Sequence, residues 1–517
     1  MAVKKTILLS LLAVACLAAE WVDLATVHRI RVEATERSKV GDHLFYLSDY
    51  FGPRVTNSSG FRKAAEWVVK RLGEYGLVNV HEEPWGPFGR AWENEFFSAH
   101  VVEPNYAPLS GFALAYTAST PSAVTAEAVL APLTTDADLE KFKGKLKGKV
   151  VLLDALRPPD QPPPTTRTLL RSGRYTDEDL QRIALAPEPV PERPPVDFAR
   201  QREFRAKLAA FLRDEGVVAA ITHGRMGNSG TIFGAGGGSH DPKTPLAPPM
   251  AVIAVEQYNR ICRLLAKKVP VKIQLEIRNK VSEDSLDSFN VIGEIPGGQK
   301  RDEVVMLGAH LDSWQGGTGA TDNAAGSAVV IEAVRILKAL NLKMDRTVRV
   351  ALWSAEEQGL LGSRAYVTAH FADRDTMQLK PEHAKLAAYF NLDNGSGKIR
   401  GIYLQNNDML RPVFEEWLKP FRDMGAAAVT IRNTTGTDHL SFDAVGLPGF
   451  QFIQDPLDYN TKTHHSNMDV VDYVKIEDLM QASAVMASFV YHAATRPDPL
   501  PRKPLPEPRN QPRRQTQ

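Results

Sequence analysis

The sequence predicts a mixed α/β protein in which a largely parallel sheet is flanked by helices and a second, β-rich domain is inserted. Two observations predict this fold class. From about residue 286 onwards, short apolar strand patterns alternate with helical patterns, which is typical of parallel strands joined by crossover helices. Between residues 118 and 275 the pattern changes to short β-rich runs around one helical run, which indicates a separate insert.

The elements of the first domain are predicted from their apolar periodicity. Residues 61–77 repeat apolar side chains at the period of an amphipathic helix, and the turn-forming residues 57–60 precede them. Later in the chain, three strand candidates are predicted over residues 303–307, 347–353 and 386–392. We therefore expect residues 20–117 and 276–495 to form one discontinuous domain.

Two segments are rich in proline and arginine. Residues 157–199 lie inside the insert, and we expect them to form an exposed excursion without regular elements. Residues 496–517 close the chain, and their composition predicts a disordered tail.

The composition excludes several classes of protein. Hydrophobic residues make up 43% and charged residues 24% of the 517 residues, which is ordinary globular usage. Lys and Arg number 62 against 61 Asp and Glu, so no basic field for nucleic acid is expected. Only two cysteines are present, Cys16 and Cys262, which excludes a disulfide framework and a Cys-rich zinc site.

The N-terminus has the pattern of an export signal. Lys4 and Lys5 precede an apolar run over residues 6–17, and small residues follow before Glu20. We expect residues 1–19 to be a signal peptide that directs the protein to the periplasm or outside the cell. No other stretch approaches about 18 uncharged apolar residues, so no stable membrane span is expected. Lipoprotein anchoring at Cys16 is a weaker alternative, because the residues before it match that cleavage box poorly.

Side chains that bind metal ions gather where the predicted strands end. These are His310 and Asp312, Asp322 before a helix, Glu356 and Glu357, Asp393, and the pair His464 and His465 before Asp469. Each segment alone is weak evidence, since a lone histidine or a glutamate pair is usually structural or solvated. The carboxyl ends of parallel strands meet at one crevice, however, so these segments are expected to converge there.

The number of potential ligands favours two ions over one. His310, Asp322, Glu357, Asp393 and His465 offer two imidazoles and three carboxylates. A mononuclear catalytic zinc needs three protein ligands and a water, whereas two ions can share a bridging carboxylate. Imidazole with carboxylate suits Zn²⁺ best, with Co²⁺ or Mn²⁺ as substitutes.

The sequence lacks the motifs of other classes of hydrolytic enzyme. The sequence has neither the His-Glu-x-x-His helix of mononuclear metalloproteases nor the Gly-x-Ser-x-Gly elbow of serine hydrolases. Asp312, two residues after His310, is well placed to orient that imidazole.

Four motifs together resemble the co-catalytic zinc exopeptidases, a family that includes carboxypeptidase Q, bacterial leucyl aminopeptidases and glutamate carboxypeptidase. The motifs are Gly-Ala-His-Leu-Asp-Ser at 308–313, Gly-Ala-Thr-Asp-Asn at 319–323, Leu-Trp-Ser-Ala-Glu-Glu-Gln-Gly at 352–359 and His-His-Ser-Asn-Met-Asp at 464–469. The resemblance is strongest to members of the carboxypeptidase Q type. It also implies that residues 118–275 form a protease-associated domain, with Gly-Lys-Val-Val at 148–151 as its signature.

The resemblance implies a role for each site residue. One zinc ion would take Asp322, Glu357 and His465, and the other His310, Asp322 and Asp393. Glu356 would be the general base. Asp312, placed by its spacing to orient His310, is the other predicted catalytic residue. His465 is favoured over His464 because the family ligand stands four residues before an acidic residue, here Asp469.

Three functions remain open from the sequence. The first is an exported di-zinc exopeptidase that cleaves short peptides or dipeptides through a metal-activated water. The second is an aminopeptidase of broader range, and the third is a metal-free, receptor-like binding protein on the same scaffold. The presence of all five ligand positions and the base disfavours the third. The sequence does not predict the oligomeric state, for which a homodimer is one possibility.

Overall fold

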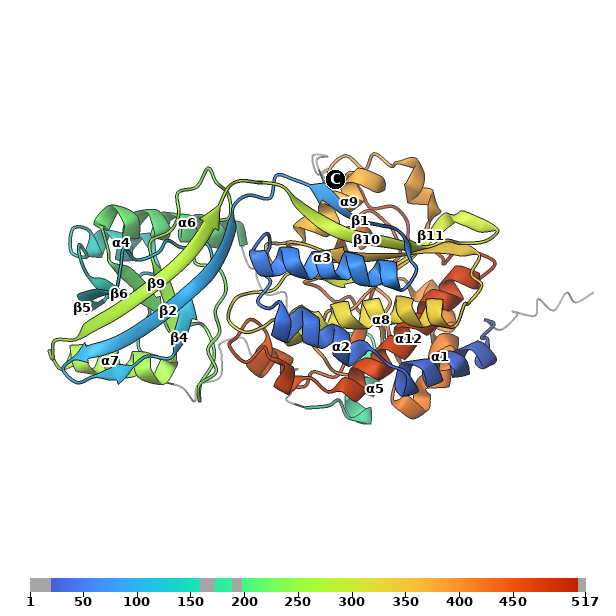
Figure 1. Cartoon of the computed structure of the whole chain (residues 1–517), viewed down its shortest axis with the longest axis horizontal. Coiled ribbons are helices and arrows are strands. Elements are labelled where there is room, and N and C mark those ends of the chain that lie inside the picture. The colour runs from blue at the N-terminus through green and yellow to red at the C-terminus, as the bar shows by residue number, and fades with distance from the viewer. Residues whose placement is uncertain (1–19, 159–172, 188–197, 510–517) are drawn as a thin grey trace, which may run out of the picture.

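The computed structural model describes residues 20–158, 173–187 and 198–509. The predicted signal peptide and Cys16 lie outside these residues. Figure 1 shows two lobes, each built around its own sheet. Among the residues that the structure describes, no helix is both long and apolar enough to cross a membrane.

The first lobe contains an eight-stranded mixed sheet, which agrees with the predicted fold class. Its spatial order is β1 (Val78–Trp85), β10 (Ser288–Ile295), β12 (Arg346–Trp353), β11 (Lys300–His310), β13 (Leu386–Asn391), β16 (Gly449–Gln454), β14 (Ile399–Tyr403) and β15 (Ala428–Thr430). The central strands β12, β11, β13 and β16 run parallel to one another, while β10 and β14 flank them antiparallel. The three strands predicted from apolar runs are β11, β12 and β13.

Helices cover both faces of this sheet. One face carries α1 (Leu24–Glu36), α2 (Val40–Phe45), α3 (Ser59–Glu74), α8 (Ala325–Ala339) and α12 (Ile476–Thr495), whose apolar side chains form the largest core with the sheet. A separate core of aliphatic and aromatic residues packs α9 (Leu361–His370) and α11 (His439–Asp443) against the sheet. Helix α10 (Arg411–Leu418) contributes to the first core. Helix α3 begins where Ser58 accepts a hydrogen bond from the Phe61 amide, close to the predicted start.

The second lobe is larger than the predicted insert. Its sheet has the order β3 (Ala107–Pro108), β2 (Ala91–Glu103), β9 (Lys272–Ser282), β5 (Val124–Leu130), β6 (Val150–Leu152), β7 (Ala219–Thr222), β8 (Met250–Ile253) and β4 (Gly111–Ala113). The long strands β2 and β9 pair antiparallel from Ala91↔Ser282 to Glu103↔Lys272. The predicted boundaries at 117/118 and 275/276 therefore cut through this sheet, and the lobe extends outward over 91–282. Its helices are α4 (Asp136–Phe142), α6 (Phe198–Glu215) and α7 (Val255–Ala266).

Part of the predicted Pro-rich excursion is a helix packed on the first lobe. Residues 173–187 contain α5 (Asp177–Ala184), which begins with a capping box between Thr176 and Asp179 and lies among the first-lobe helices in Figure 1. Thr430 of β15 donates a hydrogen bond to the carbonyl of Ile183, whose side chain is buried. The expectation of an exposed excursion without regular elements is wrong here, because capping and a buried isoleucine outweigh the surrounding prolines.

The tail is also ordered over its described part. Between residues 496 and 509, Arg502 donates hydrogen bonds to the carbonyls of His383 and Leu386, and Asn407 donates one to the carbonyl of Pro501. Leu500 joins the main core of the first lobe. The predicted disorder is therefore wrong for these residues. Proline removes amide donors, but the arginine and leucine side chains between the prolines provide the contacts.

Leu500→Ala should lower the free energy of unfolding by about 2–5 kcal/mol, the usual cost of truncating a buried leucine. The side chain is 2% exposed. Leu505→Ala is the matched control in the same tail, since Leu505 is 52% exposed and should change stability by less than about 0.5 kcal/mol. Urea unfolding measures both, and equal small effects would show that the tail does not pack on the core.

Candidate metal centre

The predicted site residues converge at the carboxyl ends of the central strands. His310 is the last residue of β11, which lies between β12 and β13 in parallel register. Glu356 and Glu357 follow β12, and Asp393 follows β13. Asp322 lies in the turn before α8, and His465 lies in the loop after β16. All five predicted ligands come together as the parallel topology requires.

Asp322 is at the centre of the cluster. Its Oδ1 atom lies 3.2 Å from His310 Nε2, which is also 3.5 Å from Asp393 Oδ1. Its Oδ2 atom lies 3.2 Å from His465 Nε2, which is also 2.9 Å from Glu357 Oε2. The two carboxylate oxygens of Asp322 thus face two separate groups of side chains. Either group has the imidazole and carboxylate donors that suit Zn²⁺.

Several polar atoms in the cluster are buried without a normal hydrogen bond to any described residue. They are His310 Nε2, Asp322 Oδ2 and Glu357 Oε1. Buried polar atoms in folded proteins are almost always hydrogen-bonded, so each such atom needs an explanation. Three such atoms lie within one cluster of imidazole and carboxylate side chains, and bound cations would explain them.

The electrostatics of the cluster also favour bound cations. Burial, together with the charges of Asp393, Asp438 and Glu357, raises the pKa of Glu356 well above its ordinary value. Burial and the charge of Asp322 raise the pKa of Glu357 to about 7. These carboxylates repel one another in a dry environment, and a divalent cation between them would remove that repulsion.

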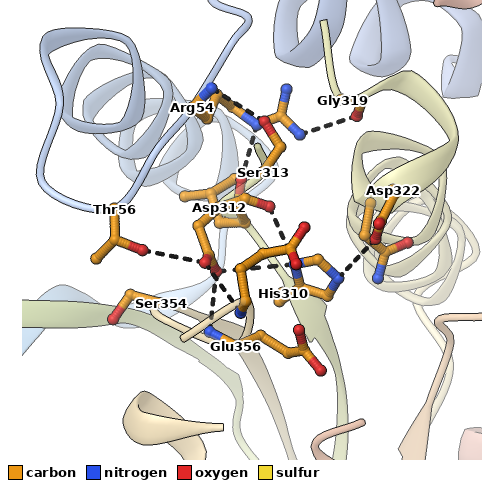
Figure 2. Close-up of polar contacts among 12 residues, drawn as sticks. Arg54, Thr56, His310, Asp312, Ser313, Gly319, Asp322, Ser354 and Glu356 are labelled. Carbon is orange, nitrogen blue, oxygen red and sulfur yellow. Dashed lines mark hydrogen bonds and ion pairs between the residues drawn. The ribbon is translucent and has the colours of Figure 1, made fainter. Parts of the chain in front are cut away.

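Asp312 connects the strand end of β11 to the Glu356 loop (Figure 2). Its carboxylate accepts hydrogen bonds from the amides of Glu356 at 3.3 Å and Glu357 at 3.4 Å, and from the hydroxyl of Thr56 at 3.0 Å. His310 Nδ1 donates at 3.0 Å to the carbonyl of Asp312, whereas the Asp312 carboxylate is 3.7 Å away. The residue contacts His310 as predicted, but mainly through its backbone, while its carboxylate positions the two glutamates.

Asp469 holds the turn that carries Asp322. Its carboxylate accepts a hydrogen bond from the amide of Thr321 at 2.6 Å and from the hydroxyl of the same residue at 2.8 Å. Its carbonyl accepts a further bond from the amide of Thr318. The acidic residue that follows the histidine pair therefore supports the turn that carries Asp322.

The geometry distinguishes His464 from His465. His465 Nε2 contacts both Asp322 and Glu357, while His464 Nε2 approaches only Asp322, at 3.7 Å. The His464 ring stacks on Tyr459 with the centroids 4.7 Å apart. These contacts favour His465 as the ligand, although either ring is within reach of Asp322.

The second lobe supports the His465 loop, which the sequence did not predict. Phe233 forms a bridge with Ser466, and the amide of Gly234 donates to the carbonyl of His465 at 2.9 Å. Asn467 accepts a bond from the amide of Ile232 and donates one to the carbonyl of Gly230. On the side of the second lobe these contacts use only backbone atoms, so no side-chain pattern marks them within residues 230–234.

Three further polar residues between β15 and β16 have distinct surroundings. Arg432 donates to the carbonyls of Leu185 and Arg182 near α5, so it serves packing in this structure. Asp438 is fully buried, and burial together with the charges of Asp393 and Asp312 raises its pKa to about 7. His439 is also buried, and burial lowers its pKa to about 4.

Comparisons with known proteins agree with this site. Residues 290–490 match the sequence model described as Peptidase family M28. The chain is 27% identical to carboxypeptidase Q of Pongo abelii over 465 residues, which are 89% of this chain and 86% of that protein.

Solved structures give the same result. The peptidase M28 precursor from Shewanella amazonensis SB2B superposes with a TM-score of 0.65 at 27% identity, covering 94% of this chain and 99% of that one. A zinc aminopeptidase from Bacillus subtilis has a TM-score of 0.55 at 20% identity, covering 88% and 94% of the two chains, and shows a shared fold.

The fold and the cluster at its strand ends define a metallopeptidase. Residues 290–490, which match the Peptidase family M28 model, include all five predicted ligands, so this part of the chain is similar to that family.

Proposed function

We propose that this chain is an exported, zinc-dependent exopeptidase that hydrolyses short peptides or dipeptides in the manner of carboxypeptidase Q. The observation that carries the proposal is the convergence of His310, Asp322, Glu357, Asp393 and His465 beside Glu356. The similarity to carboxypeptidase Q over most of both chains supports the substrate class. The zinc named for the Bacillus subtilis structure supports the choice of metal.

We assign His310, Asp322 and Asp393 to one ion, and Asp322, Glu357 and His465 to the other. Bound Zn²⁺ supplies Lewis-acid chemistry to such a site. Asp322 can serve both ions because its two oxygens face opposite groups. Asp312 holds the backbone of both glutamates, which keeps Glu357 directed at an ion and leaves Glu356 free for proton transfer.

Glu356 has the surroundings of a general base. It is buried beside the proposed ligands, and its backbone amide is hydrogen-bonded to Asp312, which supports a fixed position for the carboxylate next to the ions. In the proposed reaction it takes a proton from the attacking water and then donates it to the leaving amine.

We further propose that the second lobe is a protease-associated domain. Its loop at residues 230–234 contacts the His465 loop, which supports a role of this lobe next to the site.

A panel of peptides tests the proposed function. The purified protein should cleave dipeptides and tripeptides with free ends, and should not cleave peptides that are blocked at both ends. Cleavage of N-acetylated peptides with a free carboxylate supports a carboxypeptidase. Cleavage that requires a free amino group supports the aminopeptidase alternative instead. Turnover of doubly blocked peptides, or of no peptide at all, would contradict an exopeptidase.

His465→Ala should weaken Zn²⁺ binding more than His464→Ala, because only His465 contacts two carboxylates of the cluster. Zinc affinity is measured for both variants by competition with a chromogenic chelator. The two substitutions remove the same side chain from adjacent positions, so each is a control for the other. The reverse order of affinities would assign the ligand to His464.

A further inference from the structure

Arg54 is a fully buried arginine beside the metal centre, with an exposed fraction of 0%. Its guanidinium donates from Nε to the carbonyl of Leu311 at 2.7 Å, from Nη1 to the carbonyl of Thr318 at 2.9 Å and from Nη2 to the carbonyl of Gly319 at 3.0 Å. Nη1 also donates to the carbonyl of Leu47. Within the described part of the chain, no carboxylate lies at ion-pair distance from it.

Most of these acceptors belong to the segment that joins two proposed ligands. Leu311 directly follows His310, and Gly319 lies just before the turn that carries Asp322. Ser313, two residues after Leu311, makes two hydrogen bonds with the Arg54 backbone. Its hydroxyl accepts from the Arg54 amide and its amide donates to the Arg54 carbonyl, each at 3.0 Å. Figure 2 shows Arg54 between Ser313 and Gly319, above the His310 and Asp322 side chains.

The close packing at Gly319 shows how little space this arrangement leaves. Gly319 adopts a left-handed backbone with φ of 69°, and a Cβ atom there would meet Ser313 Cβ at 2.4 Å and Arg54 Nη2 at 3.0 Å. Hydrogen bonds from Arg54 thus hold this segment near both of its ends, at 311–313 and at 318–319.

Burial of a guanidinium without a carboxylate partner has a substantial desolvation cost. Burial lowers the pKa of Arg54 to about 10, and the charges of Asp469, Asp312 and Asp322 act in the opposite direction. The group is therefore cationic at neutral pH. A buried charge with this desolvation cost, beside several acidic side chains, indicates that Arg54 does more than pack the interior.

We propose that Arg54 is a positioning residue, which fixes the segment between His310 and Asp322 so that both side chains face the same metal ion. This inference rests on the proposed metal site. The backbone carbonyls set the position of the segment, and the fork of the guanidinium bonds three of them at once. Groups that orient metal ligands typically contribute 10–100-fold to metal affinity.

Arg54→Lys tests the proposal, with Arg346→Lys as the matched control. Arg346 is also fully buried and donates to the backbone carbonyl of Ala493 and to Glu303, but it is the first residue of β12, at the end of the strand away from the site. Both variants should lose stability, as measured by thermal unfolding of the metal-free protein. Arg54→Lys alone should bind Zn²⁺ about 10–100-fold more weakly in chelator competition. It alone should also change the visible spectrum of bound Co²⁺, which reports ligand geometry.

Two results would overturn the inference. One is a folded Arg54→Lys protein with wild-type Zn²⁺ affinity and an unchanged Co²⁺ spectrum, and the other is an equal loss of affinity in Arg346→Lys. If Arg54→Lys does not fold, Ser313→Ala removes one bond of the same arrangement and should weaken Zn²⁺ binding to a smaller extent, so unchanged affinity there would also overturn it. A wild-type protein that binds no Zn²⁺ and cleaves no peptide would instead refute the proposed function.

Discussion

Removal of metal by a strong chelator should abolish peptide hydrolysis, and about two equivalents of Zn²⁺ per chain should restore it. The reason is the arrangement of the cluster, in which the two oxygens of Asp322 face His310 on one side and His465 on the other. Neither of these two groups of side chains can bind both ions by itself. Elemental analysis combined with titration of the metal-free protein measures the stoichiometry of reactivation.

Co²⁺ or Mn²⁺ should also restore activity, since both accept imidazole and carboxylate ligands, whereas Mg²⁺ should restore little. Thermal unfolding of the metal-free protein provides the control for loss of fold. Full activity with one tightly bound ion would contradict the bridging role of Asp322. It would leave a mononuclear peptidase that uses only one of the two groups.

Glu356→Gln should lower kcat by about 10²–10⁴, the usual contribution of a general base. Glutamine keeps the size of the buried side chain but cannot accept a proton, and the backbone bond to Asp312 is unaffected. Metal content and stability should therefore remain close to those of the wild type. Steady-state kinetics on a dipeptide substrate and elemental analysis of the same sample measure both quantities.

Glu357→Gln is the matched control, because it makes the same change at the neighbouring position. Glu357 contacts His465 at 2.9 Å, so its loss should weaken metal binding at one site. The two variants should differ in kind, one losing turnover with metal retained and the other losing metal. A Glu356→Gln protein with near wild-type kcat and a full metal complement would remove Glu356 from the mechanism.

The two glutamates also show what adjacent residues can do beyond a strand end. Glu356 and Glu357 follow β12 in a loop, where side chains need not alternate as they do along a strand. Asp312 accepts a hydrogen bond from the amide of each. The different roles that the resemblance implies for the two glutamates stay a prediction, which the Glu356→Gln and Glu357→Gln variants test.

The sequence by itself determined the class of fold and the composition of the cluster. The apolar runs that became β11, β12 and β13 are local patterns, and side chains such as His310 and Asp393 directly follow them. Parallel strands bring their carboxyl ends to one edge, so a local pattern was enough to predict convergence of distant residues. The assignment of His465 over His464 depended on the resemblance to known enzymes, and the contacts with Glu357 favour it.

Only the tertiary structure decided the extent of the second lobe, the docking of α5, the packing of the tail and the environment of Arg54. Strands β2 and β9 pair across most of the insert, a contact that no local window contains. Arg54 and Arg502 both donate to backbone carbonyls. Every residue has a backbone carbonyl, so a hydrogen bond to a carbonyl does not require any particular side chain at the acceptor residue. Such contacts exist only once the chain has brought donor and acceptor together.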